Sequence, residues 1–247
     1  MINFFRRIRK KLADDNKPLK YMRYAIGEIL LVVIGILIAL QINNWNEFRK
    51  DRKLESDYLK ETNWEFKRNK EQFGNLLETH RDVCNTCDKM MTMVPFTKTK
   101  WDSLHYYYQQ SIVLAPRFNP SSSTIESLIN NASIDIIRND SLRVLLLDWN
   151  NLLADWKEEE TEATESVMNM RNWTYENVSI DMVSSTNDFA TSRLVNFEKL
   201  FVFQNLVRLR CLMSKFILEG NTYSERNETL KLMKVMDRVI LLSQLEE

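Results

Sequence analysis

The stretch from Ala25 to Ile42, AIGEILLVVIGILIALQI, constrains the fold of this chain more than any other feature. It is apolar except for Glu28 near its start and Gln41 near its end. At 1.5 Å per residue, a helix from Tyr24 to Trp45 is about 31 Å long, close to the hydrocarbon thickness of a bilayer. Aromatic residues flank the stretch on both sides, as is typical of membrane interfaces. The sequence therefore predicts a transmembrane helix over residues 25–45, in preference to a buried core helix.

The distribution of basic residues predicts the orientation of this helix. Only Asp14 and Asp15 oppose the basic residues that precede it, which are Arg6, Arg7, Arg9, Lys10, Lys11, Lys17, Lys20 and Arg23. After it, basic and acidic residues alternate. An excess of Lys and Arg marks the cytoplasmic side. We expect residues 1–24 in the cytoplasm, the helix in the inner (cytoplasmic) membrane, and the C-terminal domain in the periplasm.

A cleaved signal peptide is the main alternative to an uncleaved signal anchor. The basic leader is long, and no A-x-A-like cleavage site follows the apolar stretch. Residues 1–16 place Phe4, Phe5, Ile8 and Leu12 on one helical face, which fits either an amphipathic helix on the anionic leaflet or a basic flank that only sets topology.

One face of the transmembrane helix predicts contact with a partner helix. Gly35 and Ala39 lie within about 20° of Glu28 on a helical wheel, and Val32 and Ile42 extend the same stripe. The Gly35-x-x-x-Ala39 pair allows close helix approach. We expect a homo-oligomer with this stripe at the interface; alternatively, Glu28 extends to the headgroups and plays no part in it.

Composition favours long helices in the rest of the chain. The chain has 247 residues, with four glycines and four prolines, so few turns are available. The net charge is zero, which argues against a nucleic-acid partner. We therefore predict an all-α protein: a basic cytoplasmic segment at 1–24, the transmembrane helix at 25–45, a stalk helix at 46–93, and a helical bundle at 94–247 that packs with the distal part of the stalk.

The stalk shows apolar residues at 3-4 spacing with polar interruptions. Its apolar positions are Phe48, Leu59, Phe66, Phe73, Leu76, Val83, Cys87 and Met90, and its polar positions are Arg52, Glu55, Thr62, Asn69 and His80. Packing is expected to improve from Phe66 onward.

The pair Cys84-x-x-Cys87 lies within this helical pattern. A redox pair normally sits at a helix N-terminus in a fold with strands. A metal site at these cysteines would need two more ligands, and the only histidines in the sequence are His80 and His105. We interpret both cysteines as small core residues that could form a disulfide with each other in an oxidising compartment.

The bundle helices are expected at 101–112, 123–131, 140–175, 194–219 and 222–245. Ser123-Thr124-Ile125-Glu126 fits a capping box for the second of them, and Gly220 fits the C-cap of the fourth. The acidic stretch of residues 158–165 is interpreted as a solvated face. The last helix is expected to point Leu230, Met233, Met236, Ile240 and Leu241 inward.

Two stretches carry a resemblance to a known family. They are KYMRYAIGEILLVVIGILIALQINNWNE at residues 20–47 and FNPSSSTIESLINNASIDIIRNDSLRVLL at residues 118–146. The chain resembles an uncharacterised family of single-pass membrane proteins common in Bacteroidota. Members often have Ser-Gly where this chain has Asn131-Ala132-Ser133. The resemblance implies no known activity.

No Ser/His/Asp set, Cys/His set, metal cluster or phosphate-binding loop is visible in the sequence. We therefore expect no catalysis and no cofactor. The predicted function is that of a membrane-anchored extracytoplasmic scaffold or adaptor that binds an unidentified protein partner. The alternative is a helical-bundle sensor domain that binds a small ligand and signals through a partner.

Overall fold

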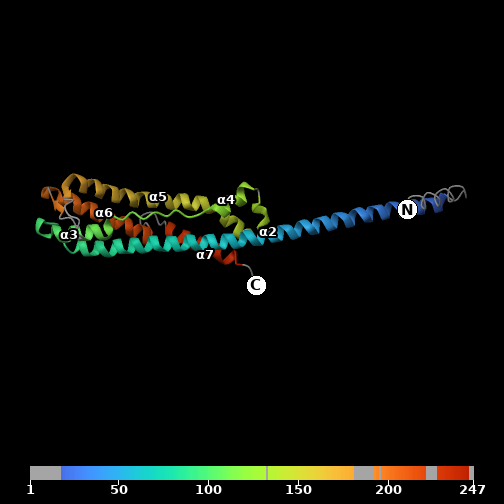
Figure 1. Ribbon diagram of the computed structural model, residues 1–247, viewed down its shortest axis with the longest axis horizontal. Helices are drawn as coiled ribbons and strands as arrows, with labels where there is room; N and C mark the ends of the chain where they lie inside the picture. Colours follow the sequence, from blue (N-terminus) through green and yellow to red (C-terminus); the bar gives the residue numbers. More distant parts are fainter. Residues whose placement is uncertain (1–17, 132, 181–191, 195, 221–226, 245–247) are drawn as a thin grey trace, which may run out of the picture. The chain divides into compact units, whose positions relative to one another are not determined.

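The computed structural model describes residues 18–131, 133–180, 192–194, 196–220 and 227–244. Most of these residues lie in helices, so the predicted all-α class is confirmed (Figure 1). The amphipathic helix predicted at residues 1–16 lies outside the described residues. The α-helices are α2 (Pro18–Met91), α3 (Trp101–Tyr107), α4 (Ser123–Asn130), α5 (Asp140–Asn177), α6 (Leu200–Glu219) and α7 (Glu228–Leu242).

Several short elements join these helices. Three of them are 3-10 turns, η1 (Lys98–Lys100), η3 (Ile134–Ile136) and η4 (Phe197–Lys199). A π-helical turn, η2 (Tyr108–Ile112), follows α3, so the single helix predicted at 101–112 changes its winding halfway. Strands β1 (Val178–Ile180) and β2 (Ser192–Leu194) form a short antiparallel pair that the sequence analysis did not predict.

The chain divides into two compact units, residues 1–56 and 57–247, and the boundary falls inside the stalk predicted at 46–93. In the first unit, the described residues are all helical. Pro18 is the first residue of α2, a position where the missing N–H of proline leaves no helical hydrogen bond unmade. Proline therefore starts this helix.

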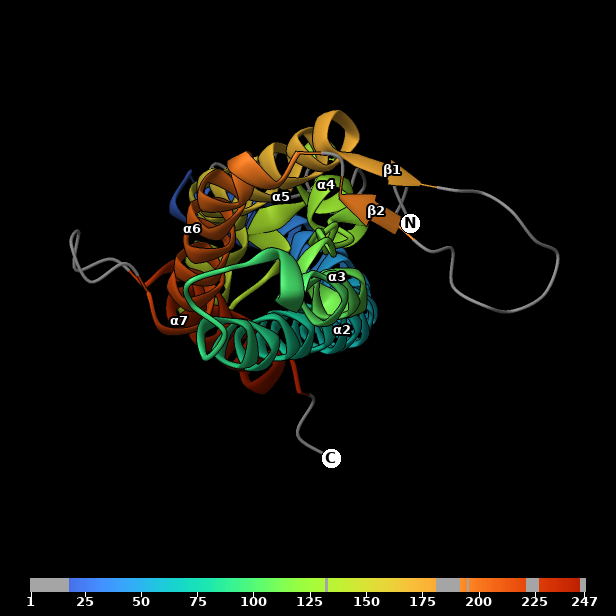
Figure 2. The same ribbon diagram turned by 90° about the vertical axis from the view of Figure 1, so that its left-hand side faces the viewer.

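In the second unit, α2 buries one continuous face. Phe66, Phe73, Leu76, Val83 and Met90 are each at most 4% exposed, as the 3-4 spacing predicted. The first core cluster joins this face to α5 and α7, with the rings of Phe66 and Trp149 at 4.7 Å and those of Phe73 and Trp156 at 4.9 Å. Viewed from the end, α2, α5, α6 and α7 lie around a common centre (Figure 2).

A second core cluster lies around α3 and α6. The side chains of Trp101, Tyr108, Trp173 and Phe203 pack together, and the Trp173 and Phe203 rings stack with their centroids 4.6 Å apart. Burial of several aromatic rings makes this cluster a large apolar contribution to stability.

Residues 113–122, here called the strap, connect η2 to α4 without helix or strand. Figure 1 shows the strap as an extended trace along the bundle. Because an extended segment outside a sheet has no ladder of backbone hydrogen bonds, its buried N–H and C=O groups need other partners.

Candidate functional site

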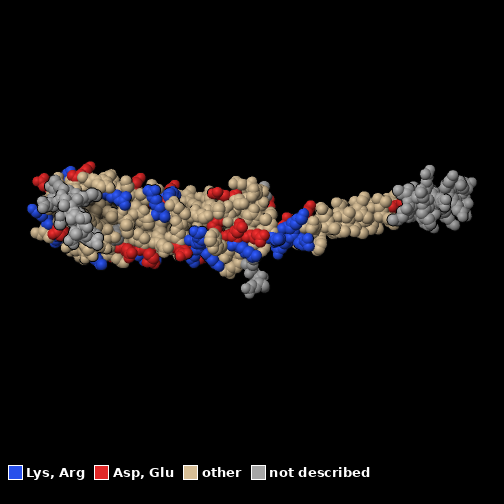
Figure 3. Space-filling view, viewed as in Figure 1, with Lys and Arg blue, Asp and Glu red and all other residues tan. Residues whose placement is uncertain are grey.

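The apolar stretch of α2 is the first candidate site. Within the described residues, α2 holds the one helical stretch that is long and apolar enough to cross a membrane, and none of that stretch is buried. Figure 3 shows it free of Lys and Arg, with basic residues gathered just beyond it; these are Arg49, Lys50, Arg52 and Lys53. This stretch is compatible with a single-pass membrane anchor.

The predicted interface stripe lies on the surface of this segment. Val32 is 55% and Ile42 61% exposed, and Ala39 is exposed as well. A Cβ added at Gly35 would meet no atom within 4 Å, so another helix could approach the backbone there. Glu28 lies on the same stripe with intermediate exposure. That this stripe binds a partner helix stays a prediction.

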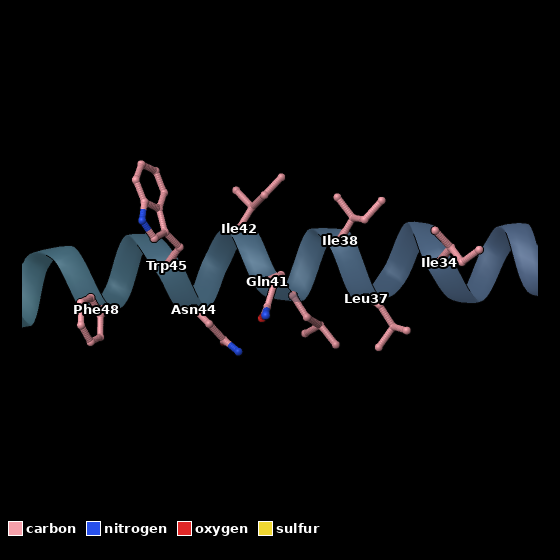
Figure 4. Close-up of a pocket in the computed structure, with 9 residues that line it drawn as sticks. Ile34, Leu37, Ile38, Gln41, Ile42, Asn44, Trp45 and Phe48 are labelled. Atoms are coloured by element: carbon pink, nitrogen blue, oxygen red, sulfur yellow. The ribbon is translucent and has the colours of Figure 1, made fainter.

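A shallow hollow lies along the last part of the same segment and the residues just after it. Figure 4 shows its side chains projecting from a single helix, so the hollow is an open apolar surface suited to lipid tails or another helix. The guanidinium of Arg49 lies 5.6 Å from the centre of the Trp45 ring. An indole beside a guanidinium is a typical side-chain pair for a membrane interface. The lining residues are Ile34, Leu37, Ile38, Leu40, Gln41, Ile42, Asn44, Trp45 and Phe48.

In the second unit, two polar side chains of α2 hold the start of α4. The Glu65 carboxylate accepts hydrogen bonds from the backbone N–H of Ser123 at 2.7 Å and of Thr124 at 3.0 Å. Asn69 binds the backbone of Ser121 twice, donating to its C=O at 2.8 Å and accepting from its N–H at 2.9 Å. Both side chains are 3% exposed.

This arrangement corrects the predicted capping box at Ser123–Glu126. Ser122 occupies the N-cap position and its side chain makes no capping bond. Glu65 supplies the acceptor from another helix and also places a negative charge at the helix N-terminus. Burial raises the pKa of Glu65, but hydrogen bonds from Ser121, Thr124 and Ser123 outweigh burial and hold the pKa below its ordinary value.

Replacement of Glu65 by glutamine tests this cap. Because an amide N–H cannot accept from the N–H of α4, we expect E65Q to lower the free energy of unfolding at neutral pH by about 2 kcal/mol. The lowered pKa means that the stabilisation is present above the ordinary value of 4.5 and is lost as pH falls through the folded-state pKa. The difference between wild type and E65Q should therefore shrink in acid.

Thermal unfolding across pH measures this difference. Glu71, exposed on the same helix, gives the matched control, and E71Q should unfold like the wild type. An E65Q variant as stable as E71Q at neutral pH would contradict the assignment of Glu65 as the cap.

Long side chains from α5 and α6 bind the strap. Arg210 donates to the C=O of Ile112 at 3.2 Å and of Leu114 at 2.8 Å, and Arg171 donates to the C=O of Val113 at 2.7 Å. Glu160 accepts from the backbone N–H of Phe118. Together with Glu65 and Asn69, these are the clamp residues, and they supply hydrogen-bond partners to backbone groups of the strap and of the residues that adjoin it.

The sequence analysis identified none of the clamp residues Glu65, Glu160, Arg171 and Arg210 as a buried polar contact. Glu160 belongs to the acidic stretch interpreted as solvated, yet it is 4% exposed. Arg210 is fully buried, and burial lowers its pKa to about 10, so its guanidinium stays charged at neutral pH. The spacing of residues in α6 could have indicated that Arg210 is buried. Arg210 lies on the same 3-4 spaced face as the buried residues Phe203, Val207, Ser214 and Ile217.

The structure pairs the cysteines differently from the prediction. Cys87 forms a disulfide with Cys211 of α6, with the Cα atoms 5.7 Å apart, and Cys84 is a free, half-buried thiol. The predicted Cys84–Cys87 bond is therefore wrong. The reason is helical phase: Cys87 lies on the buried face of α2, whereas Cys84 lies at its edge. Burial raises the pKa of the Cys84 thiol, which keeps it protonated near neutral pH.

The histidines do not converge on a site. His80 is buried with Nδ1 3.2 Å from the Ser214 hydroxyl, and burial together with the charge of Arg210 lowers its pKa to about 3. His105 packs beside Trp101 in the second core cluster, and neither of its ring nitrogens has a hydrogen-bond partner in the described part of the chain. Among the described residues, no group of three or more His, Cys, Asp or Glu side chains could hold a metal ion.

Fold and geometry together describe a helical bundle carrying one candidate N-terminal membrane helix. A family model described as "Family of unknown function (DUF6090)" matches residues 28–146, just under half of the chain. The expected resemblance to an uncharacterised family is confirmed to that extent. The matched region includes most of the apolar stretch, the strap and α4, and with them Glu65 and Asn69. No curated protein and no solved structure matches the chain.

Proposed function

We propose that this chain is a membrane-anchored scaffold or adaptor whose helical bundle lies outside the cytoplasm and binds another protein. The observation that carries the proposal is the apolar stretch of α2, none of which is buried and which leads into a folded helical unit of its own chain. A bundle tethered in this way is held close to any partner in or near the same membrane, which raises its effective concentration.

The Cys87–Cys211 disulfide supports an extracytoplasmic bundle. Disulfides persist in the bacterial periplasm and other oxidising compartments, whereas cytosolic reductants keep thiols reduced. The basic residues before the apolar stretch agree with this orientation, because they favour a cytoplasmic N-terminus. The proposed location is the inner membrane, with the bundle in the periplasm.

The interactions of the buried polar residues support binding rather than catalysis. Glu65, Glu160 and Arg210 each hydrogen-bond backbone groups of the chain itself. Catalytic acids and bases need access to a substrate. We therefore propose an adaptor without enzymatic activity, tested by crosslinking in native membranes and identification of the captured protein.

Reporter fusions test the topology. A phosphatase that is active only after export, placed after Glu247, should be active in cells, and a fluorescent protein that matures only in the cytoplasm should stay dark at the same position. The physical reason is the excess of basic residues before the apolar stretch. Fluorescence at this position, or a mature protein that begins near Gln41, would rule out the proposed anchor.

Substitution of Gly35 tests the proposed homo-oligomer. A leucine at position 35 would force the backbones apart, so G35L should weaken association in the membrane by about 1–2 kcal/mol. Val33 lies on a different face, and V33L should associate like the wild type. Cysteine crosslinking along residues 28–42 measures the contact; crosslinks without helical periodicity, or a monomer throughout, would contradict this interface.

A further inference from the structure

A polar groove in the second unit has no role in the preceding proposal. A hollow of about 390 Å³ lies between α2 and the end of the strap, and a second of about 470 Å³ lies beside it. Trp64 and Glu65 line both hollows, so the two hollows adjoin at these residues. The hollows are of the size of small-ligand sites.

Three carboxamides in the first hollow have unused hydrogen-bonding capacity. Gln72, Asn75 and Asn119 are exposed, and within the described part of the chain their side chains make no hydrogen bond. Each carboxamide offers both donors and an acceptor from one planar group. A ligand that suits them therefore carries groups that donate and accept at once, as hydroxyl groups do.

Trp64 adds an aromatic surface to these carboxamides. Its side chain is 62% exposed, which is unusual for the largest apolar residue type. The Arg68 guanidinium lies 4.7 Å from the ring centre, and Arg68 lines the first hollow but not the second. Trp64 also lines the second hollow, which Arg68 does not, and a ring with C–H groups on its face could pack against the indole there.

We propose that this groove binds a chain of neutral sugar residues, with one sugar in each hollow and the Trp64 ring between them. Pairs of sugar hydroxyl groups can donate to and accept from the three carboxamides, and the C–H face of a pyranose ring can pack against the indole. The charges argue against an anion, because Glu65 and Glu71 offset Arg68 in the first hollow. A peptide hot spot would be expected in a well-packed, desolvated pocket, whereas these hollows are open.

Titration calorimetry on the full-length protein tests the proposal. The probes are tetrasaccharides of β1,4-linked N-acetylglucosamine, β1,4-linked glucose and α1,4-linked glucose, each added up to millimolar concentration. The protein is kept in nanodiscs or a non-glycosidic detergent, because maltoside and glucoside detergents would compete for the groove. We expect at least one tetrasaccharide to bind, and W64A to weaken that binding about tenfold.

Matched variants separate the groove from general effects. N119A should weaken binding several-fold, while Y175A, which removes an even more exposed aromatic ring from α5, should bind like the wild type. Because Trp64 and Asn119 are exposed, both variants should keep the helical circular dichroism of the wild type. Failure of all three tetrasaccharides to bind, or equal binding by W64A and the wild type, would overturn the proposal.

A photocrosslinker at position 72 tests whether the groove binds a protein instead of a saccharide. Capture of a protein there, with no saccharide bound by calorimetry, would assign the groove to a protein partner and overturn the sugar site while leaving the adaptor function intact. Conversely, sugar binding without any captured protein partner would support the groove and count against the adaptor.

Discussion

Replacement of both Cys87 and Cys211 by serine should lower the free energy of unfolding by about 4–5 kcal/mol. The bond joins residues separated by 124 positions, and closing so long a loop removes much conformational entropy from the unfolded chain. A loss of this size is comparable to the whole stability of many domains, so C87S/C211S should show a markedly lower unfolding temperature. Thermal unfolding followed by circular dichroism measures it.

The free cysteine supplies the control. C84S leaves the disulfide in place and should unfold within about 0.5 kcal/mol of the wild type. Mass spectrometry of the non-reduced protein, digested after alkylation, should find Cys87 linked to Cys211 and the label on Cys84. A Cys84–Cys87 linkage would contradict the structure and restore the pairing predicted from the sequence.

Replacement of Arg210 by methionine should be the next most damaging change, with a loss of about 2–4 kcal/mol. Methionine keeps much of the apolar volume but leaves the C=O groups of Ile112 and Leu114 without their donor. Each buried polar group that loses its partner costs about 1–3 kcal/mol. Chemical denaturation of the full-length protein should show the loss as a lower midpoint with an unchanged slope.

Arg208 gives a matched control two positions away, because its side chain is exposed on α6. R208M should unfold like the wild type, so a shift in R210M alone would report the buried hydrogen bonds. Equal stability of R210M and R208M would mean that water can replace the guanidinium at the strap.

Much of the α2 structure could be predicted because one periodic pattern determines it. The apolar positions from Phe66 to Met90 repeat at 3-4 spacing, and they are the residues that the bundle buries. The same periodicity was less informative in α7, where most positions are apolar. Leu230 and Leu241 were expected inward and are 45% and 54% exposed, while Leu232, Met236 and Val239 are buried. Packing partners, rather than periodicity, decide between two apolar faces.

The polar interruptions could not be interpreted from the sequence for a related reason. Asn69 and His80 interrupt the apolar pattern of the stalk, yet each is buried beside a polar group of a distant segment. Glu65 contacts residues 58 and 59 positions away, and no local pattern records such a contact. Cysteine pairing is similar, because three cysteines permit three single disulfides and only the fold selects one.

The way in which the strap is held has a consequence for sequence divergence. Glu65, Asn69, Glu160, Arg171 and Arg210 all bind strap or adjoining residues through backbone atoms. Backbone groups are common to all amino acids, so exposed positions such as Arg117 can change freely while the clamp residues stay fixed. Proline is the exception at positions 118 and 121, where the N–H is a donor. Among related sequences, the strap should therefore drift in composition but exclude proline at those two positions.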